Sequence, residues 1–170
     1  MAALTPNSAR VLQTVGLTTT AILAGASASF SIYTVPRLLE SPTPLLLKQF
    51  KHMFAAGHDT VPAGTVVAAT SLLYLAYDSR AAGSPAWRGY ATAAALALGI
   101  IPYTLIVMMG TNKVLLDEAE VAEVAAEKVE TKAASVKQLL DQWATMNLGR
   151  SVLLASAAVT ATWTALGKGV

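Results

Sequence analysis

Four stretches of the chain contain no charged residue, and this pattern constrains the fold more than any other feature of the sequence. They comprise 26, 18, 24 and 17 residues, at positions 11–36, 60–77, 89–112 and 151–167. A helix that crosses the apolar core of a bilayer needs about 20 apolar residues, within a range of about 17–25. The sequence therefore predicts one membrane domain, 1–170, with spans at about 11–35, 60–77, 89–112 and 151–167.

The composition agrees with an integral membrane protein. Of the 170 residues, 54% are hydrophobic and 13% are charged, whereas a soluble domain carries about 25% charged residues. A soluble bundle with wholly apolar core helices is the alternative, but such helices need polar partners that this chain lacks. The net charge of +2 gives no reason to expect nucleic acid as a partner. The absence of cysteine excludes disulfides and thiolate metal sites.

The connection between the first two stretches predicts a short amphipathic helix. Pro36 ends or kinks the first span, and Pro42-Thr43-Pro44 forms a turn. After this turn, apolar residues follow helical spacing and basic residues share the opposite face, which is typical of a helix in the membrane interface. The apolar residues are Leu46, Leu47, Phe50, Met53 and Phe54, and the basic ones are Lys48, Lys51 and His52. We expect Asp59 to cap the second span and Pro62 to occupy its first turn.

Residues 113–150 differ from the rest because they are acidic and contain no glycine or proline before Gly149. Apolar residues recur at steps of three and four from Leu116 to Trp143, which predicts one long extramembrane helical extension with the acids facing water. The same steps then reach Asn147 and Arg150, so two polar residues continue a packed stripe. Arg150 either snorkels to headgroups or finds a partner in a polar cluster.

Polar residues capable of chemistry are predicted to converge at one end of the bundle. His58 precedes the second span, Asn112 ends the third and Arg150 precedes the fourth, so alternation of the spans places all three on one side of the membrane. A histidine beside Asp59 fits a general base with an orienting carboxylate, or alternatively an interfacial histidine beside a helix cap. Tyr103 follows the helix-breaking Pro102 within the third span, and its hydroxyl needs a partner there.

Motifs for common cofactors are absent from the sequence. There is no glycine-rich phosphate loop and no dinucleotide fingerprint. Two histidines six residues apart make a poor metal site, and no Glu-x-x-His motif of di-iron bundles occurs. We therefore expect no metal and no organic cofactor. The Lys and Arg residues on the two sides of the predicted spans do not decide the orientation.

A set of motifs along the chain resembles the anthrone oxygenase family, small four-span membrane proteins first catalogued as a domain of unknown function, DUF1772. The resemblance covers about residues 12–165 and rests on Ser29-Phe30, Val35-Pro36, Gly57, Pro62, Pro102-Tyr103-Thr104, Thr111-Asn112 and Trp143-x-x-x-Asn147-x-x-Arg150. Fungal members act in aromatic polyketide pathways, where they oxidise an anthrone at its methylene carbon to an anthraquinone. Many bacterial members have no assigned activity.

This resemblance implies an all-α membrane oxygenase whose substrate is a polyketide anthrone and whose co-substrate is molecular oxygen, in an internal membrane such as the endoplasmic reticulum. On this hypothesis His58, oriented by Asp59, removes a proton from the methylene carbon. The resulting oxyanion is stabilised by Asn112, Asn147 and Arg150, and the ring pocket is lined by Phe30, Phe54, Tyr103 and Trp143. The alternatives are a non-catalytic binding or scaffold protein and, less favoured, a permeation protein.

The oligomeric state stays open on the sequence. Ala21, Gly25 and Ser29 form a face of small residues in the first span. Such a face permits a homodimer, but it serves equally well for close helix packing within one bundle.

Overall fold

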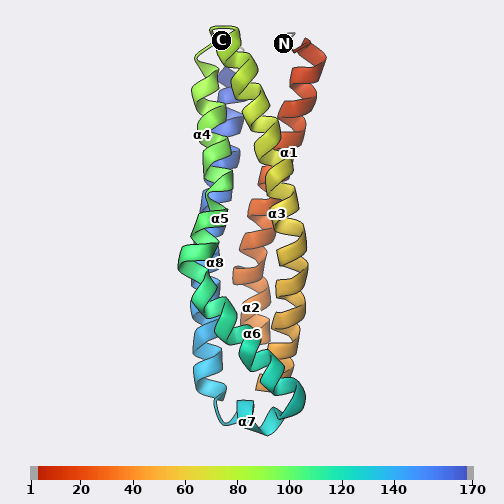
Figure 1. The fold of residues 1–170 in the computed structure, drawn as a ribbon, viewed down its shortest axis with the longest axis vertical. Coiled ribbons are helices and arrows are strands. Elements are labelled where there is room, and N and C mark those ends of the chain that lie inside the picture. Colours follow the sequence, from red (N-terminus) through yellow and green to blue (C-terminus); the bar gives the residue numbers. More distant parts are fainter. Residues whose placement is uncertain (1–3, 168–170) are drawn as a thin grey trace. The chain divides into compact units, whose positions relative to one another are not determined.

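The computed structural model describes residues 4–167, and every regular element within them is a helix (Figure 1). This confirms the predicted all-α class. The elements are α1 (Pro6–Ser29), the π-helix η1 (Phe30–Thr34), α2 (Val35–Leu38), α3 (Thr43–Ala81), α4 (Ala86–Leu98), α5 (Ile100–Tyr103), the π-helix η2 (Thr104–Met108), α6 (Met109–Val124), α7 (Ala126–Glu130) and α8 (Ala133–Leu166).

Three continuous helical segments are long enough and apolar enough to cross a membrane. They are Pro6–Leu38, Thr43–Ala81 and Ala86–Val124, and they contain the first three predicted spans. All but the last residue of the fourth uncharged stretch, 151–167, lie in α8, which does not belong to this set. It is the shortest stretch, and it carries hydroxyl groups at Ser151, Ser156, Thr160, Thr162 and Thr164. The fourth crossing therefore stays a prediction.

The helices contribute to two compact units. Among the described residues, unit 1 comprises 4–25, 61–102 and 151–167, and unit 2 comprises 26–60 and 103–150. Most of the predicted spans fall in unit 1, whereas the two long connections fall in unit 2. Large apolar side chains are exposed in both units, for example Trp163 at 80% and Ile106 at 82%, as contact with lipid requires.

Unit 1 packs through small residues that let helix backbones approach closely. Gly16 of α1 lies against Leu72 of α3, Gly64 of α3 lies against Leu23, and Gly89 of α4 lies so close to Thr164 of α8 that a Cβ atom would overlap it. Of the two uses expected for the small-residue face of the first span, close packing within the chain is not found at Ala21 and Gly25. Ala21 and Gly25 are exposed, and no atom lies near a Cβ at Gly25, because the helix buries the adjacent face instead.

Unit 2 shows that the single long helix predicted for 113–150 is wrong. The backbone breaks at Ala125, with φ −150° and ψ 67°, and α7 lies at the turn that joins α6 to α8 (Figure 1). The apolar stripe folds back on itself, because Leu115 and Ala119 of α6 share one core with Val136 and Leu140 of α8. This return buries apolar side chains that a straight helix would leave exposed, and burial outweighs the local preference for one helix.

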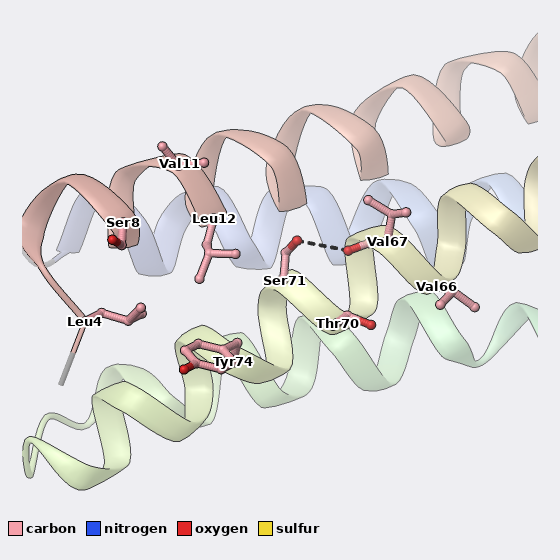
Figure 2. A pocket seen from close by; sticks show the side chains of 9 residues that line it. All are labelled: Leu4, Ser8, Val11, Leu12, Val66, Val67, Thr70, Ser71 and Tyr74. Carbon is pink, nitrogen blue, oxygen red and sulfur yellow. Dashed lines mark hydrogen bonds between the residues drawn. The ribbon is translucent and has the colours of Figure 1, made fainter. Parts of the chain in front are cut away.

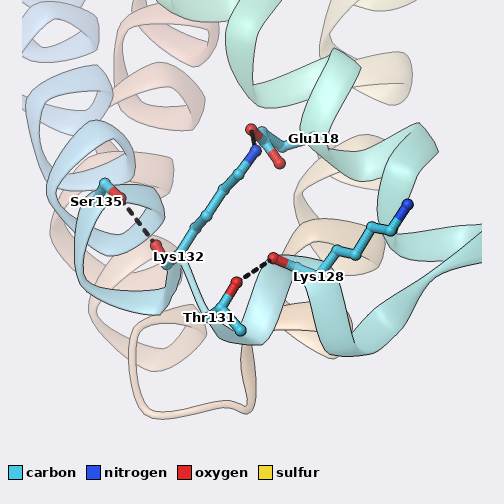
Figure 3. A network of polar contacts seen from close by, with 5 residues as sticks. All are labelled: Glu118, Lys128, Thr131, Lys132 and Ser135. Atoms are coloured by element: carbon cyan, nitrogen blue, oxygen red, sulfur yellow. Dashed lines mark hydrogen bonds and ion pairs between the residues drawn. The ribbon is translucent and has the colours of Figure 1, made fainter.

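Polar contacts hold the turn around α7. Lys132 Nζ forms an ion pair with Glu118 Oε1 at 2.6 Å, and the hydroxyls of Thr131 and Ser135 donate to the carbonyl oxygens of Lys128 and Lys132 (Figure 3). Glu130 Oε2 accepts a hydrogen bond from the backbone N–H of Thr43, where its charge suits the N-terminus of α3. The acids Asp117, Glu120, Glu123, Glu127 and Glu130 are exposed, as predicted, whereas Glu118 is half-buried where it pairs with Lys132.

The predicted interfacial amphipathic helix is not a separate element. Helix α3 begins at Thr43 and continues through Asp59 and Pro62 to Ala81, so Asp59 is no helix cap. The apolar stripe is buried in the core of unit 2, with Leu46, Leu47 and Phe50 fully buried. Proline keeps a helical φ but removes one backbone hydrogen bond. Helix α3 tolerates Pro62 because its residues before and after this position are packed in the cores of the two units.

Two π-helical turns interrupt the regular helices of unit 2. η1 precedes Pro36, and η2 follows Pro102. A proline leaves the carbonyl four residues earlier without its usual donor. For Pro36 this carbonyl is that of Ile32, within η1, and for Pro102 it is that of Leu98, where α4 ends. The irregularities expected at both prolines are confirmed. Phe30 is the first residue of η1, and Tyr103 directly precedes η2.

Candidate functional site

All nine residues that the sequence singled out for chemistry or substrate binding belong to unit 2. One group comes from the first segment of this unit, 26–60, and the other from the second segment, 103–150. Direct contacts join Asn112 to Trp143, His58 to Asp59 and Phe54 to His58, and His58 and Asp59 lie at the surface. The residues are Phe30, Phe54, His58, Asp59, Tyr103, Asn112, Trp143, Asn147 and Arg150.

Asn112 and Trp143 form a buried polar pair between α6 and α8. Asn112 is 5% exposed, and its Oδ1 accepts a hydrogen bond from Trp143 Nε1 at 2.8 Å. An indole N–H can only donate, so this bond turns the oxygen of the Asn112 amide toward Trp143 and leaves its NH₂ group as a donor. The side chain of Asn112 makes no other hydrogen bond to residues 4–167. The amide donor of this buried residue is thus oriented and available.

Asn147 ties α8 to the end of α1 and to η1. It is 1% exposed, and its Nδ2 donates to the Ser27 carbonyl at 2.8 Å and to Ser31 Oγ at 2.9 Å. Ser27 Oγ donates to Asn147 Oδ1 at 3.3 Å, and Ser31 Oγ donates to the Ala144 carbonyl at 2.8 Å. Both amide hydrogens of Asn147 are engaged. A ligand oxygen could use them only by displacing Ser27 or Ser31.

Tyr103 is fixed against α8 by a close backbone approach. Its hydroxyl donates to the Met146 carbonyl at 3.0 Å, so the predicted need for a partner is confirmed. A Cβ atom at Gly149 would overlap the Tyr103 hydroxyl oxygen. Gly149 is therefore required as a glycine for the phenol to reach α8 at this point, one helical turn after Met146.

Arg150 carries a buried donor without a partner. Its Nε is buried and makes no hydrogen bond within the described chain, and the guanidinium forms no ion pair with a carboxylate there. The Tyr103 hydroxyl is close enough to interact with it electrostatically. A buried donor left unsatisfied costs about 1–3 kcal/mol, and more when it is charged. A bound oxyanion would relieve this cost, which makes Arg150 the most direct indication of a ligand.

A row of aromatic rings links Trp143, the partner of Asn112, to His58. Trp143 meets Phe50 edge to face at 5.4 Å, Phe50 meets Phe54 at 5.9 Å, and Phe54 stacks on the His58 ring at 6.2 Å. Phe54 and Phe30 are half-buried and pack against the same core. Rings at these separations attract one another, and their faces suit flat aromatic ligands.

His58 and Asp59 themselves lie at the surface. Their side chains are 72% and 81% exposed, with His58 Nδ1 at 3.3 Å from Asp59 Oδ1. The geometry of the pair fits an imidazole oriented by a neighbouring carboxylate. The structure shows no direct contact of either residue with Asn112, Asn147 or Arg150.

Four residues of this site were missed by the sequence analysis. Ser27 and Ser31 hold Asn147, Gly149 admits Tyr103, and Phe50 joins Phe54 to Trp143. The four-residue spacing of Leu23, Ser27 and Ser31 was available as a signal for the two serines, since it marks one helix face. Nothing in the sequence distinguished Gly149 from the other glycines.

A separate groove of about 660 Å³ lies in unit 1, between α1 and α3 (Figure 2). Its lining is mainly apolar, with hydroxyls from Ser8, Thr70, Ser71 and Tyr74, and it includes none of the nine residues. Ser71 Oγ is engaged with the Val67 carbonyl of its own helix. No group of three or more His, Asp or Glu side chains in residues 4–167 is arranged to hold a metal ion.

These features describe an all-helical protein with apolar helices long enough to span a membrane. Its second unit also carries buried polar side chains, among them Asn112 and Asn147. The sequence profile of the family described as anthrone oxygenase matches residues 50–160. The chain belongs to the anthrone oxygenase family, which confirms the resemblance noted in the sequence.

Relatives support this membership over most of the chain. The anthrone oxygenase AgnL2 of Paecilomyces divaricatus is 33% identical over 146 residues, covering 83% of this chain and 87% of the relative. The anthrone oxygenase of Emericella nidulans is 30% identical over 184 aligned residues, covering 89% and 95%. The noranthrone monooxygenase of Aspergillus flavus is 26% identical over 140 residues, covering 81% and 65%. No solved structure matches the chain.

Proposed function

We propose that this protein is an oxygenase that converts a polyketide anthrone to its anthraquinone with molecular oxygen, in an internal membrane such as the endoplasmic reticulum. One observation carries the proposal. A member of the anthrone oxygenase family holds an oriented amide donor on the buried residue Asn112 and a buried, unpaired guanidinium nitrogen at Arg150 in the same unit. Two such donors suit an oxyanion that forms on a flat, apolar substrate.

The reaction needs no organic cofactor, because the substrate supplies the electrons. A base removes one proton from the methylene carbon, and the resulting anion is an aromatic phenolate. This anion gives an electron to oxygen, and recombination forms a carbon–oxygen bond and, with a proton, a hydroperoxide. Loss of the second hydrogen from that carbon with cleavage of the O–O bond gives the ketone and water. One oxygen atom thus enters the quinone and the other enters water.

Each of the nine candidate residues of unit 2 has a role in this scheme. The Asn112 NH₂ group and the Arg150 guanidinium stabilise the oxyanion on the former carbonyl, in a site where buried donors act strongly. Trp143 orients Asn112, and Asn147 holds α8 in place. Phe30, Phe54 and Tyr103 provide ring contacts for the substrate. His58, oriented by Asp59 and stacked on Phe54, accepts the methylene proton.

The direct test is turnover by the purified protein in lipid nanodiscs. Emodin anthrone is supplied under oxygen and under nitrogen, with and without a metal chelator, and quinone formation is followed by absorbance. We expect oxygen-dependent turnover that the chelator does not change, and incorporation of one ¹⁸O atom into the quinone from ¹⁸O₂. A lack of turnover, with the anthrone bound but unchanged, would favour the non-catalytic binding protein. Loss of activity with chelator would contradict the cofactor-independent scheme.

The base is tested separately by comparing two exposed histidines of α3. His58→Ala is expected to lower turnover roughly 10²-fold or more, as loss of a general base does. His52→Ala is the matched control, because His52 lies on the same helix and is also exposed. Full turnover by His58→Ala would show that another group is the base. The proposed roles of Asn112 and Arg150 would not be affected by that result.

A further inference from the structure

The turn between α3 and α4 in unit 1 holds two arginines against one tryptophan. Arg80 Cζ lies 5.3 Å and Arg88 Cζ lies 5.7 Å from the centre of the Trp87 ring. Both distances fall within the range of about 6 Å at which a guanidinium is attracted to an indole face. Trp87 is half-buried and both arginines are exposed, so the ring fixes two cations at one place on the surface.

The charge of this cluster is not balanced within the described chain. Neither Arg80 nor Arg88 forms an ion pair with a carboxylate of residues 4–167. The acid nearest in sequence, Asp78, accepts a hydrogen bond from the Leu4 N–H at 2.9 Å with its Oδ1. Two like charges at a single ring repel each other, and the positive end of α4, which begins at Ala86, adds to the potential. An anion placed at the cluster would remove this repulsion.

The position of the cluster along the chain indicates which anion it meets. Arg80 follows the uncharged stretch 60–77 by three residues, and Arg88 directly precedes the stretch 89–112. Residues at the ends of membrane helices lie at the depth of the lipid headgroups, where tryptophan is also favoured. Tyr77, at the end of the first of these stretches, is 56% exposed. The anion available at this depth is the phosphate of a lipid.

We propose that Arg80, Trp87 and Arg88 form a binding site for the headgroup phosphate of an anionic phospholipid. Guanidinium groups bind phosphate oxygens through paired N–H donors, and stacking on Trp87 keeps these donors in place before the lipid arrives. The site involves no residue of unit 2, so its function is separate from the proposed oxidation.

Native mass spectrometry of the full chain, released from nanodiscs of equal parts phosphatidylglycerol and phosphatidylcholine, tests this site. We expect the wild-type chain to retain phosphatidylglycerol in preference to phosphatidylcholine. The double variant Arg80→Gln/Arg88→Gln should lose that preference by about 25-fold, since one basic residue near the surface contributes about fivefold. The double variant Arg80→Lys/Arg88→Lys should keep part of the preference, because the charge is retained and the paired donors are lost.

Arg37→Gln is the matched control, because Arg37 is an exposed arginine that already pairs with Glu40 at 2.9 Å. It should leave the retained lipid unchanged. An unchanged preference in the glutamine double variant, or an equal loss in Arg37→Gln, would overturn the proposal. Displacement of the lipid by added inorganic phosphate would also overturn it, because the cluster would then be a site for free phosphate rather than for lipid.

Discussion

The two units satisfy their buried polar side chains in different ways. In unit 1 the buried hydroxyls of Thr20 and Thr65 donate to the carbonyl four residues earlier in the same helix. In unit 2 the buried Asn112 and Asn147 bond to side chains or backbone on other helices. A side-chain pair across helices in unit 1, Gln13 Nε2 to Tyr90 OH at 2.8 Å, is only partly buried.

This difference explains why a site fits unit 2. A hydroxyl that bonds to its own helix is satisfied wherever that helix lies, so it fixes no tertiary geometry. A bond between helices fixes two elements and orients both side chains, as Trp143 does for Asn112. Preorganised donors are what stabilisation of a reaction intermediate requires. The comparison therefore predicts that polar substitutions in unit 2 change activity, whereas equivalent ones in unit 1 have small effects.

The largest effect is expected for Arg150→Gln. This change removes the charge of the one buried unpaired guanidinium nitrogen described in unit 2, and loss of such an oxyanion donor lowers turnover by about 10²–10³-fold. The measurement is kcat/KM for emodin anthrone in nanodiscs. Lys113→Gln is the control, since Lys113 is exposed on α6 and should leave kcat/KM unchanged. Similar kcat/KM for both variants would remove Arg150 from the site.

The next effect concerns stability and compares the two kinds of hydrogen bond. Asn147→Leu removes three bonds between α8 and the first segment of unit 2, and we expect a loss of about 2 kcal/mol in the free energy of unfolding. Thr65→Val in unit 1 removes one bond within its helix and should cost about 0.5 kcal/mol. Both are measured by denaturant unfolding in micelles. Equal losses would contradict the distinction between the units.

A smaller effect is expected where a glycine admits Tyr103. Gly149→Ala should displace the phenol from the Met146 carbonyl and lower turnover by about tenfold, because a shift near 1 Å already reduces catalysis. Gly110→Ala is the matched control on α6, since no atom lies near a Cβ at that position. The rates of both variants are compared with that of the wild type. If Gly149→Ala kept the wild-type rate, the contact would have no part in catalysis.

The smallest effect lies at the surface of unit 2, outside the predicted spans. The hydrogen bond from Lys51 Nζ to Glu123 Oε1, 2.8 Å long, and the charge of Lys51 lower the pKa of Glu123. A lowered carboxyl pKa adds stability above its unfolded value, about 4.3, and this contribution disappears as the pH falls through the folded pKa. Glu123→Gln should therefore lower the unfolding temperature slightly at pH 7 and not at pH 3. An equal decrease at both pH values would show that the pair contributes nothing.

Much of the fold followed from periodicity and charge. The uncharged stretches located the apolar helices, and the stripe through Leu140 and Trp143 continued to Asn147 as expected, since all three are buried. Pro36 marked the π-turn η1 and Pro102 marked the end of α4, because a missing N–H has a local effect that the sequence reveals.

The failures came from tertiary packing that local patterns do not contain. The break at Ala125 has no glycine or proline to announce it, and it exists because α6 and α8 bury each other's apolar residues. Asp59 had the residue type of a helix cap, but α3 continues past it because its apolar face is held in the core of unit 2. The role of Gly149 depends on a tyrosine 46 positions away, which no spacing rule relates to it.

The central claim is that the polar side chains of unit 2, Asn112 and Arg150 among them, take part in anthrone oxidation. The variant Asn112→Leu tests this claim most directly. Leucine keeps the branched shape and the number of heavy atoms, and it removes both the NH₂ donor and the oxygen that accepts from Trp143. Asn7→Leu, at an exposed asparagine of α1, provides the control. Initial rates of quinone formation are measured for both variants, with circular dichroism to confirm equal helix content. The account predicts a loss of about 10²-fold for Asn112→Leu and none for Asn7→Leu. A folded Asn112→Leu protein with the wild-type rate would contradict it.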